Sequence, residues 1–153
     1  MPHYRKVGEP MVTEEDRDLL KAALLAQKRA HCPFSRYPVG AAVRTEDGTI
    51  VTGCNVESAS FSLTCCAERV AVFKAVSEGH KRITACSIVT VEGKPAPPCG
   101  ACRQVLYEFG RDIRIILGNP EGEVRILSLE MLLPEGFTAE QLLERAEGAK
   151  STD

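Results

Sequence analysis

The chain has 153 residues, 44% of them hydrophobic, and its 19 Lys and Arg residues against 21 Asp and Glu residues give a formal net charge of −2. This length and composition predict one domain over residues 1–153 that buries a single core of ordinary size. The near-neutral, interspersed charge lacks the basic face that a polyanion binder needs, so nucleic acid is not expected as a partner. No apolar run approaches the roughly 20 residues needed to span a bilayer, and neither a membrane partner nor an N-terminal targeting signal is expected.

The first third of the chain predicts a helix followed by a hairpin. Residues 1–12 are expected to form a loose leader. Thr13 is a suitable N-cap for a helix over "TEEDRDLLKAALLAQKRA", because acidic residues fill the first turn and apolar residues recur on one face. The prolines of "CPFSRYP" end this helix. The runs "VGAAVRT" and "TIVTGCNV" flank the turn sequence EDG at 46–48, which indicates a β-hairpin.

The remainder of the chain alternates helices and strands. Helices are predicted over 66–79 and 99–110, strands over 83–91, 113–117 and 123–127, and a frayed helical tail over 138–153. Each of the two central helices ends at a glycine, which suits a helix C-terminus. This order of elements predicts a three-layer α/β/α fold, in which a mixed, partly parallel five-stranded sheet is covered by helices on both sides.

Seven cysteines carry the strongest chemical signal. A cytoplasmic location is expected, and since thiols stay reduced there, metal binding, catalysis and burial explain cysteines better than disulfides do. Cys99 and Cys102 form "PCGAC" at a helix start, where the spacing and the helix dipole favour two thiolates on one ion. Cys66 begins the other central helix, whose N-terminus is expected alongside. Three such ligands leave a fourth position for water, which is typical of catalytic zinc.

Glu68 follows Cys66 by two residues, in the first turn of the predicted helix. A carboxylate there would lie near the metal without being a ligand and could shuttle protons. Cys-x-Glu followed by Pro-Cys-x-x-Cys is the signature of zinc deaminases. We interpret the other cysteines as packing residues; they are Cys32, Cys54, Cys65 and Cys86. The histidines are not spaced as metal ligands would be; they are His3, His31 and His80.

Taken together, "CAERVA" and "PCGACRQ" resemble the cytidine deaminase family, specifically its short, three-cysteine, homotetrameric type. The stretch "YPVGAAVRTEDGTIVTGCNVESAS" is similar to the family's substrate-binding hairpin, and "LLPEGF" is similar to its C-terminal segment. The resemblance implies a hydrolase of pyrimidine salvage that holds one zinc ion per subunit. Its expected reaction is the conversion of cytidine and 2′-deoxycytidine to uridine and 2′-deoxyuridine plus ammonia.

The resemblance also implies roles for single residues. Cys66, Cys99 and Cys102 would hold zinc, and Glu68 would move protons. Substrate contacts would come from Asn55 and Glu57 to the ribose hydroxyls, from Tyr37 near the base, and from the backbone of Ala67 to the base. Phe137 would cover the base of a neighbouring subunit in a homotetramer with shared active sites. Arg69 and Gln104 would lie beside the sulfurs.

Several other functions stay open at this stage. A Cys-x-x-Cys pair at a helix start also occurs in redox dithiols, although that function leaves Cys66 and Glu68 unexplained. A structural zinc module needs a fourth protein ligand, which no residue offers at a suitable spacing. Among deaminases, the acidic net charge disfavours a polynucleotide editor. A blasticidin-type aminonucleoside deaminase shares the three-cysteine core, but Asn55 and Glu57 favour an ordinary ribose.

Overall fold

The computed structural model describes residues 10–91 and 93–150. Residues 1–9 of the predicted leader, with His3, and the last three residues of the predicted tail lie outside this part. The elements are α1 (Glu14–Gln27), β1 (Gly40–Thr45), β2 (Ile50–Cys54), the 3₁₀ turn η1 (Phe61–Leu63), α2 (Ala67–Ser77), β3 (Ile83–Val89), α3 (Gly100–Phe109), β4 (Arg114–Gly118), β5 (Val124–Ser128), α4 (Leu129–Leu132) and α5 (Ala139–Lys150). In the described part of the chain, no helix combines the length and the apolar character needed to cross a membrane.

The five strands form one mixed sheet in the order β2-β1-β3-β4-β5. Strands β3 and β4 are parallel, and every other neighbouring pair is antiparallel. Since β2 and β3 both run antiparallel to β1, they point in the same direction. The helices α2 and α3, which follow these two strands, therefore begin at the same edge of the sheet.

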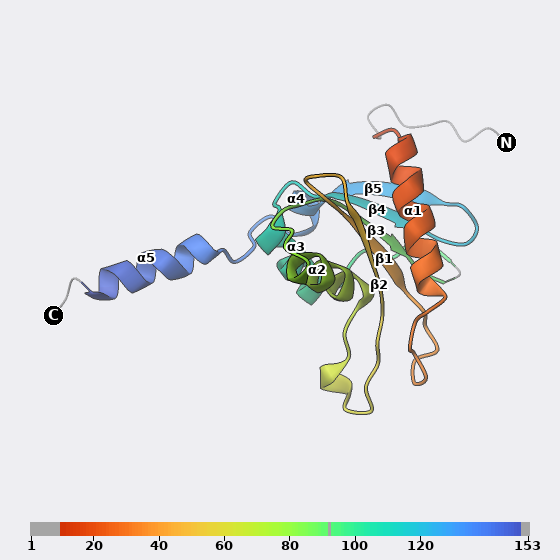
Figure 1. The fold of residues 1–153 in the computed structure, drawn as a ribbon, viewed down its shortest axis with the longest axis horizontal. Helices are drawn as coiled ribbons and strands as arrows, with labels where there is room; N and C mark the ends of the chain where they lie inside the picture. The colour runs from red at the N-terminus through yellow and green to blue at the C-terminus, as the bar shows by residue number, and fades with distance from the viewer. Residues whose placement is uncertain (1–9, 92, 151–153) are drawn as a thin grey trace.

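Helices cover both faces of the sheet, which confirms the predicted three-layer α/β/α fold (Figure 1). On one face, α2 and α3 bury Val72 and Leu106 against Ile88 of β3. On the other face, α1 buries Leu19 and Ala23 against the sheet. The C-terminal helix α5 stands away from these layers in Figure 1.

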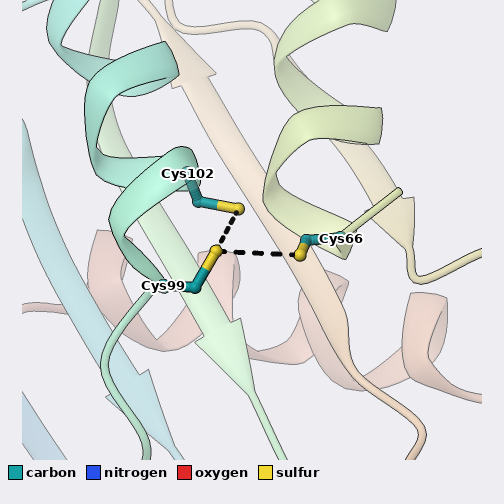
Figure 2. A group of neighbouring side chains, drawn as sticks. All are labelled: Cys66, Cys99 and Cys102. Carbon is teal, nitrogen blue, oxygen red and sulfur yellow. Dashed lines mark hydrogen bonds between the residues drawn. The ribbon is translucent and has the colours of Figure 1, made fainter. Parts of the chain in front are cut away.

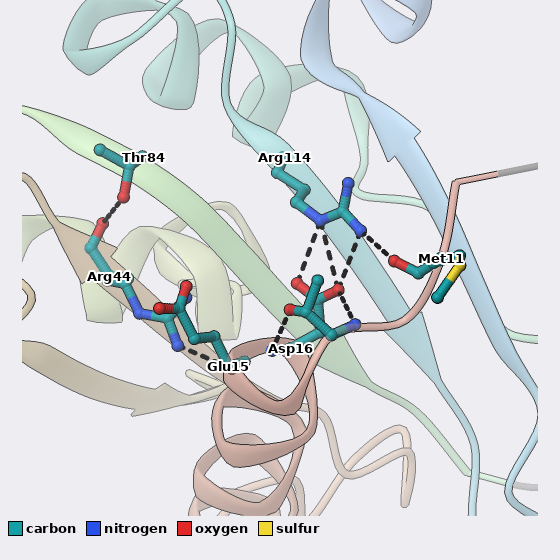
Figure 3. A network of polar contacts seen from close by, with 7 residues as sticks. Met11, Glu15, Asp16, Arg44, Thr84 and Arg114 are labelled. Carbon is teal, nitrogen blue, oxygen red and sulfur yellow. Dashed lines mark hydrogen bonds and ion pairs between the residues drawn. The ribbon is translucent and has the colours of Figure 1, made fainter.

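The start of α1 is fixed by the residues that the sequence indicated. Thr13 is the N-cap: its hydroxyl accepts a hydrogen bond from the Asp16 N–H at 3.1 Å, and the Asp16 carboxylate accepts one from the Thr13 N–H at 2.9 Å. This reciprocal pair is a capping box. The same carboxylate forms an ion pair with Arg114 of β4 at 2.9 Å, which fastens the helix to the sheet (Figure 3).

Two positions of the hairpin require glycine for different structural reasons. Gly48 adopts a φ of 87° in the turn between β1 and β2, a conformation that favours glycine. Gly53 of β2 allows close contact with α2, because a Cβ atom there would lie 2.5 Å from the Ala67 carbonyl oxygen. The start of α2, and with it the segment that carries Cys66 and Glu68, therefore lies directly against the sheet.

Candidate metal centre and site cavity

Three cysteine sulfurs meet where α2 and α3 begin (Figure 2). Cys66 is the N-cap of α2, Cys99 is the N-cap of α3, and Cys102 lies in the first turn of α3. The Sγ atoms of Cys66 and Cys99 are 3.9 Å apart, and those of Cys99 and Cys102 are 3.4 Å apart. All three sulfurs lie within 4.8 Å of one another.

The chemistry and spacing of this cluster fit zinc. Zinc–sulfur bonds of about 2.3 Å in tetrahedral geometry place sulfurs about 3.8 Å apart, close to the separations between Cys66, Cys99 and Cys102. A disulfide would need an S–S distance of about 2.05 Å, and all seven cysteines are free thiols. Within residues 10–91 and 93–150, the cluster has three protein donors and no fourth, so one position of a tetrahedral ion is available to a small molecule.

The surroundings of Cys66 favour its thiolate. Its pKa is lowered, chiefly by the neighbouring Cys102 thiol, with further contributions from Arg69 and Cys99. The pKa of Cys102 is correspondingly raised. The guanidinium of Arg69 donates to the Cys66 Sγ at 3.5 Å and to the Thr64 carbonyl at 3.2 Å. Since the thiolate is the metal-binding form, these contacts prepare the cluster for a cation.

Glu68 is a buried carboxyl group beside this cluster. It lies in the first turn of α2 and is 5% exposed. Burial is the main cause that raises its pKa to about 7, and the charge of Cys66 raises it further. A group with a pKa near neutrality can both accept and donate protons at physiological pH, as a general acid–base catalyst must.

A cavity of about 410 Å³ lies against the cluster, and we call it the site cavity. Its metal end is formed by Cys66, Ala67, Glu68 and Cys99, and other parts of its wall include Tyr37 and Asn55. The volume is in the range of pockets that bind small organic molecules. The site cavity thus brings together the thiol cluster, the buried carboxyl group and several of the residues that the sequence predicted for substrate binding.

Asn55 and Glu57 hold the loop that precedes β1. The side-chain oxygen of Asn55 accepts from the Val39 N–H at 2.8 Å, and its amide donates to the Tyr37 carbonyl at 2.9 Å. The Glu57 carboxylate accepts from the N–H groups of Phe34 and Ser35 at 2.9 and 3.1 Å and from the Ser35 hydroxyl.

Asn55 and Glu57 differ in where they lie relative to the site cavity. The hydrogen bond from Ser35 is the main cause that lowers the pKa of Glu57. Glu57 lines an exposed hollow next to the site cavity, with Phe34 and Phe61, whereas Asn55 lines the site cavity itself. A ribose contact by either residue stays a prediction.

Gln104 and Phe137 lie together, away from the site cavity. The Gln104 amide donates to the Phe137 carbonyl at 2.8 Å and accepts from the Phe137 N–H at 3.0 Å. The Phe137 side chain is 54% exposed and lines a small hollow with Tyr107 and Arg111. The predicted place of Gln104 beside the sulfurs and the predicted cover that Phe137 gives to a neighbouring subunit both stay predictions.

Some residues of the site cavity carried no motif in the sequence. Ser35, Thr64 and Thr90 contribute polar side chains to its wall. Thr90 could have been found from the period of two along the strand that precedes it, because Cys86 and Ile88 face the core on the α2 and α3 side. Among the remaining cysteines, Cys86 is fully buried, as expected of a packing residue, and Cys65 lies outside the sulfur cluster.

Comparison with known proteins agrees with this geometry. The family model for the zinc-binding region of cytidine and deoxycytidylate deaminases matches residues 13–118. A cytidine deaminase of Halalkalibacterium halodurans is 46% identical over 125 residues, which cover 81% of this chain and 95% of the relative. The crystal structure of a cytidine deaminase from Burkholderia pseudomallei superposes with a TM-score of 0.77 at 42% identity and covers 82% of this chain and 100% of that one. A blasticidin-S deaminase of Bacillus cereus is more distant, at 29% identity over 114 residues, which cover 68% of this chain and 79% of the relative.

Proposed function

We propose a reaction for this chain, which belongs to the cytidine and deoxycytidylate deaminase zinc-binding family. It converts cytidine and 2′-deoxycytidine to uridine and 2′-deoxyuridine plus ammonia. Membership in this family makes the chain a zinc-dependent hydrolytic deaminase. The observation that carries the assignment is the convergence of Cys66, Cys99 and Cys102 with the buried Glu68 on one cavity of small-molecule size.

Cys66, Cys99 and Cys102 would hold the zinc ion, which supplies a lowered pKa to the attacking water. The Glu68 carboxylate takes a proton from that water and delivers it to the ring nitrogen next to the amine-bearing carbon. Once the water's oxygen has bonded to that carbon, Glu68 would take the remaining proton of this oxygen and give it to the amine. The carbon–nitrogen bond then breaks, so ammonia leaves and a ring carbonyl remains. A pKa of about 7 suits both directions of transfer.

Arg69 offsets the negative charge of the ligand set. Three thiolates bring one more negative charge than a divalent cation neutralises. The Arg69 guanidinium lies 3.5 Å from the Cys66 Sγ, and the N-termini of α2 and α3 point their partial positive charges at the cluster. These groups keep the ligand set close to the charge that a catalytic zinc site needs.

Substrate binding is assigned to residues in the wall of the site cavity that are not metal ligands. Tyr37 and the backbone of Ala67 contact the base, and Asn55 bonds the ribose; all three line the cavity. Glu57 joins Asn55 at the ribose by exchanging its hydrogen bonds to the loop at 34–35 for bonds to the sugar hydroxyls. Binding of an ordinary ribose distinguishes this assignment from the blasticidin-type alternative. The blasticidin-S deaminase is also a more distant relative of this chain than the cytidine deaminase of Halalkalibacterium halodurans.

We further assign a homotetramer in which Phe137 covers the base in a neighbouring subunit. Its 54% exposure and its distance from the site cavity of its own chain support a role in another chain. Exposed apolar side chains at Phe34 and Phe61, in the hollow next to the site cavity, offer a surface for such a contact. The free thiols suit the reducing cytoplasm, where a pyrimidine salvage enzyme would act.

Replacing Glu68 by Gln tests the assignment. We expect kcat/KM for cytidine to fall about 10²- to 10⁴-fold, as for loss of a general acid–base group, while the zinc content stays at about one ion per chain. The assay is the loss of cytosine absorbance, with metal content measured on the same sample. Glu78→Gln, at the exposed far end of α2, is the matched control and should keep full activity.

Three outcomes would contradict the assignment. Full activity of the zinc-loaded Glu68→Gln variant would remove Glu68 from the reaction. A wild-type protein without metal that cycles reversibly between dithiol and disulfide at Cys99 and Cys102 would favour the redox function. Faster turnover of blasticidin S than of cytidine or 2′-deoxycytidine would favour the antibiotic as substrate.

A further inference from the structure

Thr90 presents a buried hydroxyl group that has no partner in the described part of the chain. The residue is 3% exposed, and its Oγ1 atom makes no hydrogen bond to the described residues. Thr90 also lines the site cavity. A buried hydroxyl that gives up water without gaining a partner lowers stability, so each such group in a folded protein calls for a physical explanation.

The backbone holds the Thr90 side chain toward the site cavity. Side chains alternate along β3, so Thr90 continues the row of Cys86 and Ile88 on the face covered by α2 and α3. The Thr90 N–H donates to the Gly118 carbonyl at 3.3 Å, which keeps the residue in line with the end of the sheet. The hydroxyl therefore lies at the strand end nearest the starts of the two helices that carry the cysteines.

Ser87 shows that an unpartnered hydroxyl on this strand need not face a ligand. Its Oγ is also buried without a partner among the described residues. It lies between Ala85 and Val89, whose side chains pack toward α1 on the other face of the sheet. Ser87 does not line the site cavity. Of these two hydroxyls, that of Thr90 can meet a molecule in the site cavity.

The residues next to Thr90 in the wall of the site cavity are apolar. Ile88, Ala96 and Pro97 line it from β3 and the loop that follows, and Val39 lines it from the residue before β1. A polar atom of a ligand that occupies this part of the cavity can give the Thr90 hydroxyl the partner that it lacks, whereas an apolar ligand atom leaves the hydroxyl buried and unpaired.

On the basis of the proposed function, we propose that Thr90 is a specificity-determining residue whose hydroxyl forms a hydrogen bond to the bound pyrimidine nucleoside. A threonine hydroxyl donates one hydrogen and accepts through its lone pairs, so it can bond either a ring carbonyl or a sugar hydroxyl. The bond contributes to binding of substrate and product alike, because Thr90 takes no part in proton transfer.

The test replaces Thr90 by Val, which keeps the shape and removes the hydroxyl, and by Ser, which keeps the hydroxyl. Ser87→Ala is the matched control from the opposite face of the same strand. For each protein, kcat and KM for cytidine, the Kd of uridine by calorimetry, the zinc content and the Tm are measured.

For Thr90→Val we expect KM and the uridine Kd to rise about three- to tenfold, with kcat within about twofold of wild type. Its Tm should equal or exceed that of the wild type, because an unpaired buried group has been removed. Thr90→Ser should bind within about twofold of wild type, and Ser87→Ala should leave both binding constants unchanged.

An unchanged KM and Kd in Thr90→Val, or an equal rise in Ser87→Ala, would overturn the inference and leave the deaminase function intact. If Tm and kcat fell in both Thr90→Val and Thr90→Ser, Thr90 would have a structural role, and the inference would also be overturned. A wild-type protein that neither deaminates cytidine nor binds uridine would overturn the proposed function together with this inference.

Discussion

Replacing Asp16 by Asn tests how α1 is fastened to the sheet. Asp16 is 1% exposed, and its two carboxylate oxygens accept from the Arg114 Nε at 3.0 Å and from the Arg114 Nη2 at 2.9 Å. One oxygen also accepts from the Thr13 N–H (Figure 3). Asparagine has nearly the same shape, but it lacks the negative charge and one of the two acceptors.

The cost of this substitution follows from the contacts that it weakens. Hydrogen bonds to charged groups contribute about 1.5–3 kcal/mol to stability. The Arg114 side chain is 34% exposed, so water can replace part of the hydrogen bonding that it loses. We therefore expect a loss of stability near the lower end of this range. We expect Asp16→Asn to lower the free energy of unfolding by about 2 kcal/mol, which lowers the Tm by about 4–8 °C for a chain of this size.

The effect also has a defined pH dependence. Burial by itself would raise the pKa of Asp16, but the hydrogen bonds from Arg114 and Thr13 outweigh it and hold the pKa below its ordinary value. A carboxyl group whose pKa is lower in the folded than in the unfolded protein stabilises the fold above its unfolded pKa. That stabilisation is lost as the pH falls through the folded pKa. The difference between wild type and Asp16→Asn should therefore be complete at pH 7 and shrink below about pH 4.

Urea unfolding at a fixed protein concentration measures this difference at each pH. Asp112→Asn is the control, because the Arg82–Asp112 pair is exposed, at 47% and 68%, and its loss should change stability by less than about 0.5 kcal/mol. The reasoning would be refuted by an Asp16→Asn protein that is as stable as the control at pH 7. It would equally be refuted by a difference that grows on acidification.

Three further substitutions probe the site and its support. Arg69→Ala should weaken zinc binding about 10- to 100-fold in competition with a chelator, because the guanidinium at the Cys66 Sγ is lost; unchanged affinity would contradict its charge role. Gln104→Leu breaks both hydrogen bonds to Phe137 and should lower kcat/KM at constant zinc content and Tm; full activity would show that this pair does not serve the site. Gly53→Ala places a Cβ atom 2.5 Å from the carbonyl oxygen of Ala67, so Tm and zinc content should fall together in thermal unfolding and metal analysis; a wild-type Tm would disprove this tight contact.

The cluster of three cysteines with Glu68 beside it could be predicted from the sequence because its geometry is largely local. Cys99 and Cys102 are three residues apart on one helix, and Glu68 is two residues from Cys66 on another, so each pair is placed by helix geometry alone. The meeting of the two helix starts follows from a topological rule. When two strands run in the same direction, the helices that follow them begin at the same edge of the sheet, and this places Cys66 beside the other two sulfurs.

Contacts between distant polar residues could not be predicted in this way. Asp16 and Arg114 are 98 residues apart, and Gln104 and Phe137 are 33 apart. No repeating pattern marks such pairs, since the sequence offers 19 basic side chains and only the folded arrangement selects Arg114 for Asp16. The same limit applies to Glu57, whose motif suggested a ligand contact while its carboxylate bonds the loop at 34–35.

The end of β3 shows why an element boundary predicted from the sequence can differ from the observed one. The β-branched run predicts a strand over 83–91, but β3 ends at Val89. Its last partners are Gly40 on β1 and Gly118 on β4, and beyond them the ladder has no further pair. Propensity reports how well a residue fits an extended backbone, whereas the end of a strand is set by where its neighbours end. Thr90 lies just past that point, on the face covered by α2 and α3, and lines the site cavity.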